Sequence, residues 1–419
     1  MIRERRRTVP GMSVTRSWTP RAWAGTVVFA LALGGCTLPS VHPVEWSRVA
    51  VSSVAALGVT PDAVIVGLAA DAAKGQAPRV LVFRAGLSSP VEVRPTTGYG
   101  AEASWLGFAS GPDGLVAVGG ARGGAHSNVR WSVWGSLTSS RSASSPSTSS
   151  GAGNGSWTFG TVAEPVEAPS PTAGSAATSS NLTLVEQPQP FETFGGWGAG
   201  ALVGITSGPE GPVIAGSWAG AVGLDIALWT PASPATWTRL PASPDLRSTP
   251  QLLRKAAGLA ATASGLVLVG DEIDLAHNVL QVPTAWIARG PTGPWTRVAL
   301  PGGPGRAEAI GCGPSDCLIA GVGADGHARA WRLSGVAASE LTLPTIGVPE
   351  GAKVPSPTTG RLAFPTASGG VLLNVAGAGV RQQTAPPGTP TALVERDGSI
   401  YLATTDAAVT TLWTAKVAA

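Results

Sequence analysis

The stretch DGLVAVG at residues 113–119 decides the fold, because it belongs to a unit that the chain repeats. A polar turn is followed by a short apolar run, and the run stops at a glycine. Runs of this length bounded by Gly, Asp or Ser are typical of a strand that follows a hairpin turn. The other copies are DAVIVG at 62–67, EGPVIAG at 210–216, SGLVLVG at 264–270 and DCLIAG at 316–321, with weaker copies GGVLLNV at 369–375 and DGSIYLAT at 397–404.

Each apolar run is flanked by further predicted strands. A strand of small residues precedes it, such as LGFAS from Leu106. A strand with one large aromatic residue follows, and then a segment such as SWTFGTV from Ser156 or TWTRLP from Thr236. Four antiparallel strands per unit, repeated radially, predict the blades of a β-propeller. The aromatic residues expected in its core are Phe83, Trp134, Trp229, Trp286, Trp331 and Trp413.

The two ends of the propeller are expected to pair. The last unit supplies three strands before the chain ends, whereas EWSRVAV at 45–51 matches the fourth-strand segment that begins at Trp295. Such pairing removes a free sheet edge. We therefore predict an all-β fold, a β-propeller of about seven four-stranded antiparallel blades whose last blade is closed by the N-terminal strand. The predicted blades span 54–95, 105–163, 201–241, 257–301, 307–344, 360–385, and 391–417 with 44–51.

The number of blades stays open between six and eight. The unit at 360–385 is short and lacks its aromatic residue, and the gap from Gly119 to Gly216 is long enough for another blade. Within that gap, Ser, Thr, Ala, Gly and Pro dominate, and this composition buries too little apolar surface to order the chain. We therefore expect flexible insertions at about 138–155 and 164–182.

The overall composition favours short strands and tight turns. The chain has 56 Gly, 36 Pro and 15 Trp, and only 13% of its residues are charged. These values differ from those of helical proteins, which are rich in Ala, Glu, Lys and Leu. We expect almost no helix outside the export signal.

The N-terminal segment has the features of an export signal. An arginine-rich start precedes an apolar run from Ala24 to Leu33, which is too short to span a bilayer, and Leu-Gly-Gly leads to Cys36. Residues 33–36 resemble the bacterial lipoprotein signal. The resemblance implies that Cys36 is acylated and becomes the new N-terminus. The alternatives are ordinary cleavage, with Cys36 unmodified, and a start at Met12 instead of Met1.

This signal predicts the organisation and location of the chain. We expect a signal peptide at 1–35, a membrane tether at 36–43 and the propeller at 44–417, held by lipid at the extracytoplasmic face of the cell membrane. Residues 1–35 hold six arginines and one glutamate, so their removal changes the net charge from +3 to about −2. A nucleic-acid partner would need a basic stripe on the folded domain. We expect no nucleic-acid partner.

The repeated unit resembles the sialidase-like (BNR-type) propellers and the photosystem II assembly-factor type of propeller. The resemblance covers residues 44–417 and rests on the pattern of the unit. The Asp-box of that group, Ser-x-Asp-x-Gly-x-x-Trp, is not intact, and residues 110–114 match it only in part. The resemblance implies the fold, but a shared fold does not establish an activity.

A pair of cysteines lies at a predicted hairpin turn. Cys312 and Cys317 flank this turn in the fifth blade, within reach of a disulfide. We expect a structural disulfide, and a redox or metal-binding pair is the alternative, although no histidine lies at ligand spacing. Residues 321–326 match Gly-x-Gly-x-x-Gly but lead into a strand, so we interpret them as a β-turn. No cofactor and no metal site are expected.

Candidate binding residues lie on the loops of one face. Because strand direction alternates, the loops between second and third strands share a face with the connectors between blades, and these loops vary most. The longest of these predicted loops runs from 271 to about 282 and holds an acidic cluster. We interpret that cluster as a solvated loop, with a cation or ligand contact as the alternative. The candidates are Asp271, Glu272, Asp274 and His277 in this loop, and Arg122, His126, Trp218 and Asp225 on equivalent loops.

No catalytic set can be assembled from the sequence. A sialidase-type mechanism needs arginines, an acid and a Tyr paired with Glu, but the chain has two tyrosines, and Tyr401 lies in a predicted strand. No Gly-x-Ser-x-Gly motif occurs, and the four histidines show no paired spacing. We therefore favour a lipid-anchored binding scaffold for a protein or an envelope glycan. The alternatives are a propeller-type carbohydrate-active hydrolase or lyase, and a structural lipoprotein without a specific ligand.

Overall fold

The computed structural model describes residues 44–112, 114–123, 128–137, 182–233, 235–377 and 379–417. In these ranges, α-helix is limited to two single turns, α1 (Gly98–Ala101) and α2 (Phe191–Phe194), and 3₁₀ turns occur at Ala72–Lys74 and Pro244–Leu246. The prediction of an all-β fold with almost no helix is therefore confirmed. None of the described helices is long and apolar enough to cross a membrane.

Several predicted features lie outside the described residues. These are the signal peptide at 1–35, Cys36, the tether at 36–43, His126, and the insertions at 138–155 and 164–182, of which only residue 182 is described.

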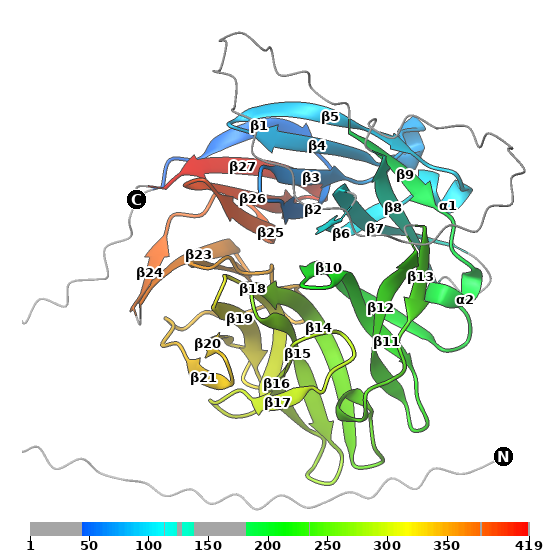
Figure 1. Ribbon diagram of the computed structural model, residues 1–419. Coiled ribbons are helices and arrows are strands. Elements are labelled where there is room, and N and C mark those ends of the chain that lie inside the picture. The colour runs from blue at the N-terminus through cyan, green and yellow to red at the C-terminus, as the bar shows by residue number, and fades with distance from the viewer. Residues whose placement is uncertain are drawn as a thin grey trace, which may run out of the picture. The chain divides into compact units, whose positions relative to one another are not determined.

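The strands form six hydrogen-bonded sheets in a propeller arrangement (Figure 1). Four of the sheets have four strands each. The first three of these are β10 (Ala199–Gly208), β11 (Gly211–Ala219), β12 (Leu224–Ser233) and β13 (Thr236–Arg239); β14 (Leu252–Thr262), β15 (Gly265–Asp274), β16 (Leu280–Ala288) and β17 (Thr296–Ala299); and β18 (Gly305–Cys312), β19 (Asp316–Gly323), β20 (Ala328–Ser334) and β21 (Ala337–Glu340). The fourth contains β25 (Thr389–Arg396), β26 (Ser399–Asp406), β27 (Val409–Lys416) and β1 (Ser47–Ser52).

The other two sheets depart from the prediction that every blade is a separate four-stranded antiparallel sheet. One has eight strands, and the other has three. The eight-stranded sheet contains β2 (Val54–Val59), β3 (Val64–Leu68), β4 (Arg79–Arg84), β5 (Leu87–Arg94), β6 (Ser104–Gly111), β7 (Gly114–Arg122), β8 (Val129–Leu137) and β9 (Thr183–Gln187). The three-stranded sheet contains β22 (Arg361–Thr366), β23 (Gly369–Ala376) and β24 (Gly379–Gln383).

Each of these two departures from the predicted blades has a structural reason. Strands β5 and β9 pair in parallel and join two four-stranded meanders edge to edge. The position beside β8 belongs to β9 and not to the segment predicted from Ser156, because β9 buries Leu184 in the core. Ser156 itself lies outside the described residues. In the three-stranded sheet, the chain passes from β24 to β25 within residues 384–388, so no length remains for a fourth strand.

The predicted pairing of the two ends is confirmed. Strand β1 pairs antiparallel with β27, with Ser47 opposite Thr414 and Arg48 opposite Trp413. Just before β1, the Trp46 indole Nε1–H donates to the carbonyl oxygen of Thr384 at 2.8 Å. The N-terminal segment therefore completes the last sheet and also contacts the chain beyond β24.

The glycine that ends each apolar run lies opposite a β-bulge in the first strand of its sheet. Opposite Gly119 and Gly270, the register of β6 and β14 shifts by one residue. A β-carbon at Gly119 would lie 2.8 Å from the carbonyl oxygen of Ser104, and one at Gly270 would lie 1.8 Å from that of Lys255. Such contacts exclude a side chain, which explains why glycine recurs. The equivalent glycines are Gly216 and Gly321, whereas a β-carbon at Gly67 would meet the side chains of Trp105 and Phe108.

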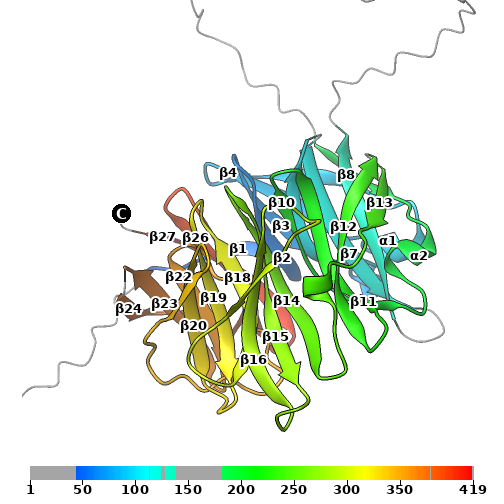
Figure 2. The same ribbon diagram turned by 60° about the horizontal axis from the view of Figure 1, so that its bottom comes forward.

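The sheets lie side by side around the ring (Figure 2). The core is divided into clusters, most of which lie between two neighbouring sheets, while one lies between the two halves of the eight-stranded sheet. One cluster, for example, includes Trp286 and joins the β10–β13 sheet to the β14–β17 sheet. Because side chains of neighbouring sheets interlock at close-packed density, each sheet holds the next in place. The predicted core role of the aromatic residues is confirmed for Phe83, Trp134, Trp229, Trp286 and Trp331, which are buried, while Trp413 is half-buried.

The alternation of strand direction divides the described loops between two faces. The connector face carries the turns from second to third strands and the connectors between sheets. The turn face carries the turns from first to second and from third to fourth strands. Strand β1 begins on the turn face. Its first residue, Ser47, pairs with Thr414 near the end of β27. The end of β27 lies beside the β25–β26 turn, since Lys416 is opposite Ser399.

Candidate functional site

The candidate site is a cleft of about 700 Å³ on the connector face. Its walls come from the end of β7, the start of β8, the connector between β9 and β10 that contains α2, and the start of β10. Loops on a rigid strand scaffold are a usual place for binding residues. The side chains that give the cleft its chemistry are Arg122, Asn128, Arg130, Trp131, Phe191 and Trp197.

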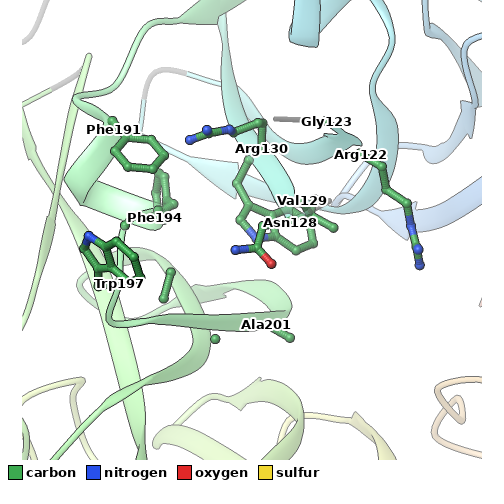
Figure 3. A pocket seen from close by; sticks show the side chains of 14 residues that line it. Arg122, Gly123, Asn128, Val129, Arg130, Phe191, Phe194, Trp197 and Ala201 are labelled. Atoms are coloured by element: carbon green, nitrogen blue, oxygen red, sulfur yellow. The ribbon is translucent and has the colours of Figure 1, made fainter. Parts of the chain in front are cut away.

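Two arginines supply the charge of the cleft. The guanidinium of Arg130 lies 4.1 Å from the centre of the Phe191 ring and 5.9 Å from that of Tyr99, which places it in cation–π range of both. Its Nε atom is buried and has no hydrogen-bond partner in the described structure. Arg122 is exposed and lies across the cleft from Trp197 (Figure 3). Neither arginine has an ion-pair partner among the described residues, and no carboxylate lines the described cleft.

Aromatic side chains form one wall of the cleft. Phe191 is about half exposed, and Trp197 is 99% exposed. A pair of buried rings supports this wall, since the ring centres of Phe194 and Trp229 lie 5.7 Å apart. The Trp229 indole N–H donates to the carbonyl oxygen of Thr193 at 2.6 Å and so fixes α2 to β12. An exposed indole on a supported connector presents a flat apolar surface with a polar edge, as interface aromatics do.

A smaller pocket of about 200 Å³ lies beside the cleft and shares Arg130 with it. Its floor contains Glu186, which is 3% exposed. This carboxylate accepts hydrogen bonds from the backbone N–H groups of Thr96 and Thr97, from both threonine hydroxyls, and from the Ser132 hydroxyl at 2.7 Å. Glu186 thus ties the connector before α1 to β8 and β9, which makes it a structural group.

Of the described residues among those predicted on equivalent loops, which are Arg122, Trp218 and Asp225, the structure brings only Arg122 to the cleft. Trp218 packs behind the wall, with its ring 6.1 Å from Trp229 and the Arg239 guanidinium 4.1 Å above it. Asp225 is a buried residue of β12 and accepts a hydrogen bond from the backbone N–H of Ser248 at 2.8 Å. Asp225 therefore holds the connector between β13 and β14 and does not face solvent.

The prediction of a long solvated loop from 271 to about 282 is wrong. Strand β15 continues to Asp274 and β16 begins at Leu280, so the turn spans only residues 275–279. Glu272 is 1% exposed and forms ion pairs with Arg254 at 3.2 Å and Arg297 at 2.5 Å. Because Arg254 of β14 and Arg297 of β17 compensate this carboxylate, Asp271 and Glu272 extend the strand and are buried.

The other members of that cluster also have structural partners. Asp271 is 1% exposed, and burial raises its pKa above the usual value, while Lys255 and Arg306 act in the opposite direction. Asp274 ends β15, and its hydrogen bond with His277 lowers its pKa. The Asp274 carboxylate also accepts from the backbone N–H groups of residues 276 and 277, so it orders the short turn.

The predicted disulfide is confirmed. Cys312 and Cys317 are bonded and lie opposite each other at the β18–β19 turn. No group of three or more His, Cys, Asp or Glu residues suited to a metal ion occurs among the described residues.

Sequence reasoning missed the residues that dominate the cleft, which are Arg130, Phe191 and Trp197. A signal for the last two was present. The connector at 188–198 contains three aromatic residues outside the repeated strand positions, of which Phe194 joins the core while Phe191 and Trp197 are exposed. Arg130 gave no comparable signal, since it lies in an ordinary third strand.

The strand order and the cleft together define the class of protein. The chain is an all-β protein with a propeller arrangement of its sheets and with a cleft of aromatic and cationic side chains on its connector face. No protein-family model matches the chain, and no curated protein matches it in sequence. Solved structures with a similar arrangement include U3-55K, at 12% identity and a TM-score of 0.47 over 90% of this chain and 100% of that chain. The polysaccharide lyase Uly1 has 10% identity and a TM-score of 0.49 over 90% and 92%. A protein named as a 6-phosphogluconolactonase from Bacteroides uniformis has 10% identity and a TM-score of 0.45 over 84% and 92%. Likeness at this level carries no statement about activity.

Proposed function

We propose that the chain is a lipid-anchored, extracytoplasmic binding scaffold whose cleft receives a protein or cell-envelope ligand. The observation that carries the proposal is the combination of Arg122 and Arg130, neither of which has an ion pair in the described structure, with the exposed Trp197. Desolvated arginines and supported aromatic rings are the groups that contribute most to recognition. The surrounding strands keep these groups in place before a ligand arrives, which lowers the entropy lost on binding.

We further propose that the ring has seven blades and belongs among the sialidase-like propellers. The count follows if the eight-stranded sheet is taken as two blades, β2–β5 and β6–β9, which share an outer edge through β5 and β9. The three-stranded sheet is then the sixth blade. The packing supports this count, because β2–β5 and β6–β9 have their own core cluster between them, as do the other neighbouring pairs.

The lipid anchor is proposed from the signal that ends at Cys36. Metabolic labelling with palmitate tests it in an export-competent bacterial host. We expect label in the wild-type chain and none in a Cys36→Ala variant, which should also leave the membrane fraction. Equal labelling of both chains would contradict acylation at Cys36.

Cross-linking in intact envelopes, followed by capture of the chain, tests the binding scaffold. We expect the wild-type chain to recover a ligand that a Trp197→Ala variant loses, because Trp197 is 99% exposed and its indole is available to a ligand at the cleft. The unfolding temperature of the variant is measured alongside, so that a loss of fold is recognised. Leu275→Ala is the matched control, since Leu275 is also exposed on the connector face but lies in a different sheet. Equal recovery by all three chains would remove the cleft from the proposal and favour a structural lipoprotein.

The described cleft gives less support to a carbohydrate-active hydrolase. Such enzymes act through a pair of carboxylates on either side of the scissile bond. Glu186 lines the adjoining pocket, and its carboxylate oxygens already accept hydrogen bonds from five donors. The arrangement therefore favours binding over hydrolysis at this cleft.

A further inference from the structure

The chain enters the fold beside a second hollow, on the face opposite the cleft. This hollow measures about 1370 Å³ and is lined by Val44, by residues of β1, and by the ends of neighbouring strands. It lies on the turn face, because its lining includes the β4–β5 turn and the β25–β26 turn. Val44 is the first described residue, so the hollow surrounds the point from which the chain leads back to Cys36.

Basic side chains exceed acidic ones in this hollow. Arg48, Arg381 and Lys416 are exposed there, and Arg48 and Lys416 have no ion pair among the described residues. The Lys416 ammonium donates only to the Ser399 hydroxyl, at 2.9 Å. Of the two carboxylates in the lining, Asp397 pairs with Arg396 at 2.9 Å, which leaves Glu45 as the carboxylate facing Arg48 and Lys416. The hollow is therefore suited to anionic groups.

One further observation points to a membrane interface at this place. Leu87 directly follows Ala85 and Gly86, which line the hollow, and it is 78% exposed, so an apolar side chain is presented to solvent at the rim of the hollow. A projecting apolar residue beside Lys and Arg is the combination by which proteins hold to a membrane interface.

We propose that the part of the turn face around Arg48, Lys416 and Leu87 binds the phosphate headgroups of anionic lipids, so that the cleft faces away from the membrane. The inference rests on the proposed anchor at Cys36. From Cys36 to Val44 the chain spans at most about 30 Å when fully extended, which keeps this face within reach of the headgroups. Tethering raises the effective concentration of the lipid, so a few basic residues suffice.

A label that reports on its surroundings tests this orientation. The full chain is produced with its lipid and reconstituted in vesicles of phosphatidylcholine, with or without phosphatidylglycerol. Leu87→Cys provides a thiol for an environment-sensitive dye, because Cys312 and Cys317 are bonded to each other. We expect this dye to show the emission typical of an apolar environment only when phosphatidylglycerol is present. A dye at Leu275→Cys, on the connector face, should not respond.

A second experiment reverses the charge of two basic residues on the proposed lipid-binding face. Arg48→Glu combined with Lys416→Glu should lower the equilibrium constant for membrane contact by roughly twentyfold or more, since each basic residue contributes about fivefold near an anionic surface. The matched control is Arg247→Glu with Lys353→Glu, which makes the same charge change on connectors between sheets. Equal loss in both pairs, an equal signal in both lipids, or a response at position 275 would overturn the proposal.

Flotation of the vesicles separates this inference from the anchor. If the chain floats with the vesicles but the dye at position 87 does not respond, the lipid-binding face is wrong and the anchor stands. If the chain does not float, the anchor fails, and the orientation that depends on it fails as well.

Discussion

Gly270 faces the carbonyl oxygen of Lys255 so closely that a β-carbon on this glycine would lie 1.8 Å from that oxygen. The contact arises because a bulge in β14 turns the Lys255 carbonyl toward β15. Most of the repeated apolar runs end in the same arrangement, so a single backbone feature accounts for the glycine that defines the repeat.

The first prediction concerns this glycine. Gly270→Ala should destabilise the ring by about 1–3 kcal/mol, because the backbone must shift to admit the methyl group. Urea unfolding followed by tryptophan fluorescence measures the change. Gly204→Ala is the control, since a β-carbon at Gly204 meets no atom within 4 Å. A loss of stability that is equal in both variants would contradict the role of the bulge.

The second prediction concerns the closure of the ring. Deletion of residues 44–51 removes most of β1 and the Trp46 hydrogen bond, and exposes the edge of β27. We expect a lower unfolding temperature and faster amide exchange in β27 than in β20, which lies within a complete sheet. Hydrogen exchange with mass spectrometry measures both strands in one sample. Unchanged protection of β27 would show that the ring does not need this pairing.

The third prediction is a dependence of stability on pH. Burial raises the pKa of Asp271 in the folded chain above its unfolded value. The folded state therefore favours the protonated acid, and this contribution to stability is present below the unfolded pKa and lost as the pH rises through the folded pKa. Asp271→Asn should accordingly raise the denaturation midpoint at neutral pH and change it little at strongly acidic pH. A variant that loses more stability at neutral than at acidic pH would show that Lys255 and Arg306 outweigh the cost of burial.

The fourth prediction concerns the wall beside the cleft. Glu186→Ala leaves the N–H groups of Thr96 and Thr97 and the Ser132 hydroxyl without their acceptor. Each buried donor left unpaired costs about 1–3 kcal/mol, so the variant should unfold at a clearly lower denaturant concentration. Glu186→Gln retains acceptor capacity and should lose less. If Gln and Ala are equally destabilising, the negative charge itself holds the connector.

Much of the fold could be predicted because its signals are local. Short apolar runs between turn residues determine strands through the alternation of side chains and the conformations that turns require. The disulfide could be predicted for the same reason, since Cys312 and Cys317 flank one hairpin turn. The closing strand was visible because residues 45–51 carry the pattern of a fourth strand that the last unit lacks.

The candidate site could be predicted only in part. Arg122 lies at the end of a predicted strand, where the connector face was expected, and it does line the cleft. Asp271 and Glu272 gave the opposite result, because a run of acidic residues usually indicates solvent. The burial of Glu272 depends on Arg254 and Arg297, which lie on other strands of the sheet, and no local pattern in β15 contains this compensation.

The sequence by itself determined the order of the repeated strands and turns, the position of the recurring glycine, and that the first folded segment resembles a missing last strand. These properties follow from short-range sterics and from the period of apolar residues. Only the tertiary structure decided that β9 completes the sheet beside β8, that Arg130 lies over Phe191, and that the chain enters on the face opposite the cleft. Each of these relations joins residues far apart in the chain, and the packing of whole sheets, which no local segment encodes, brings them together.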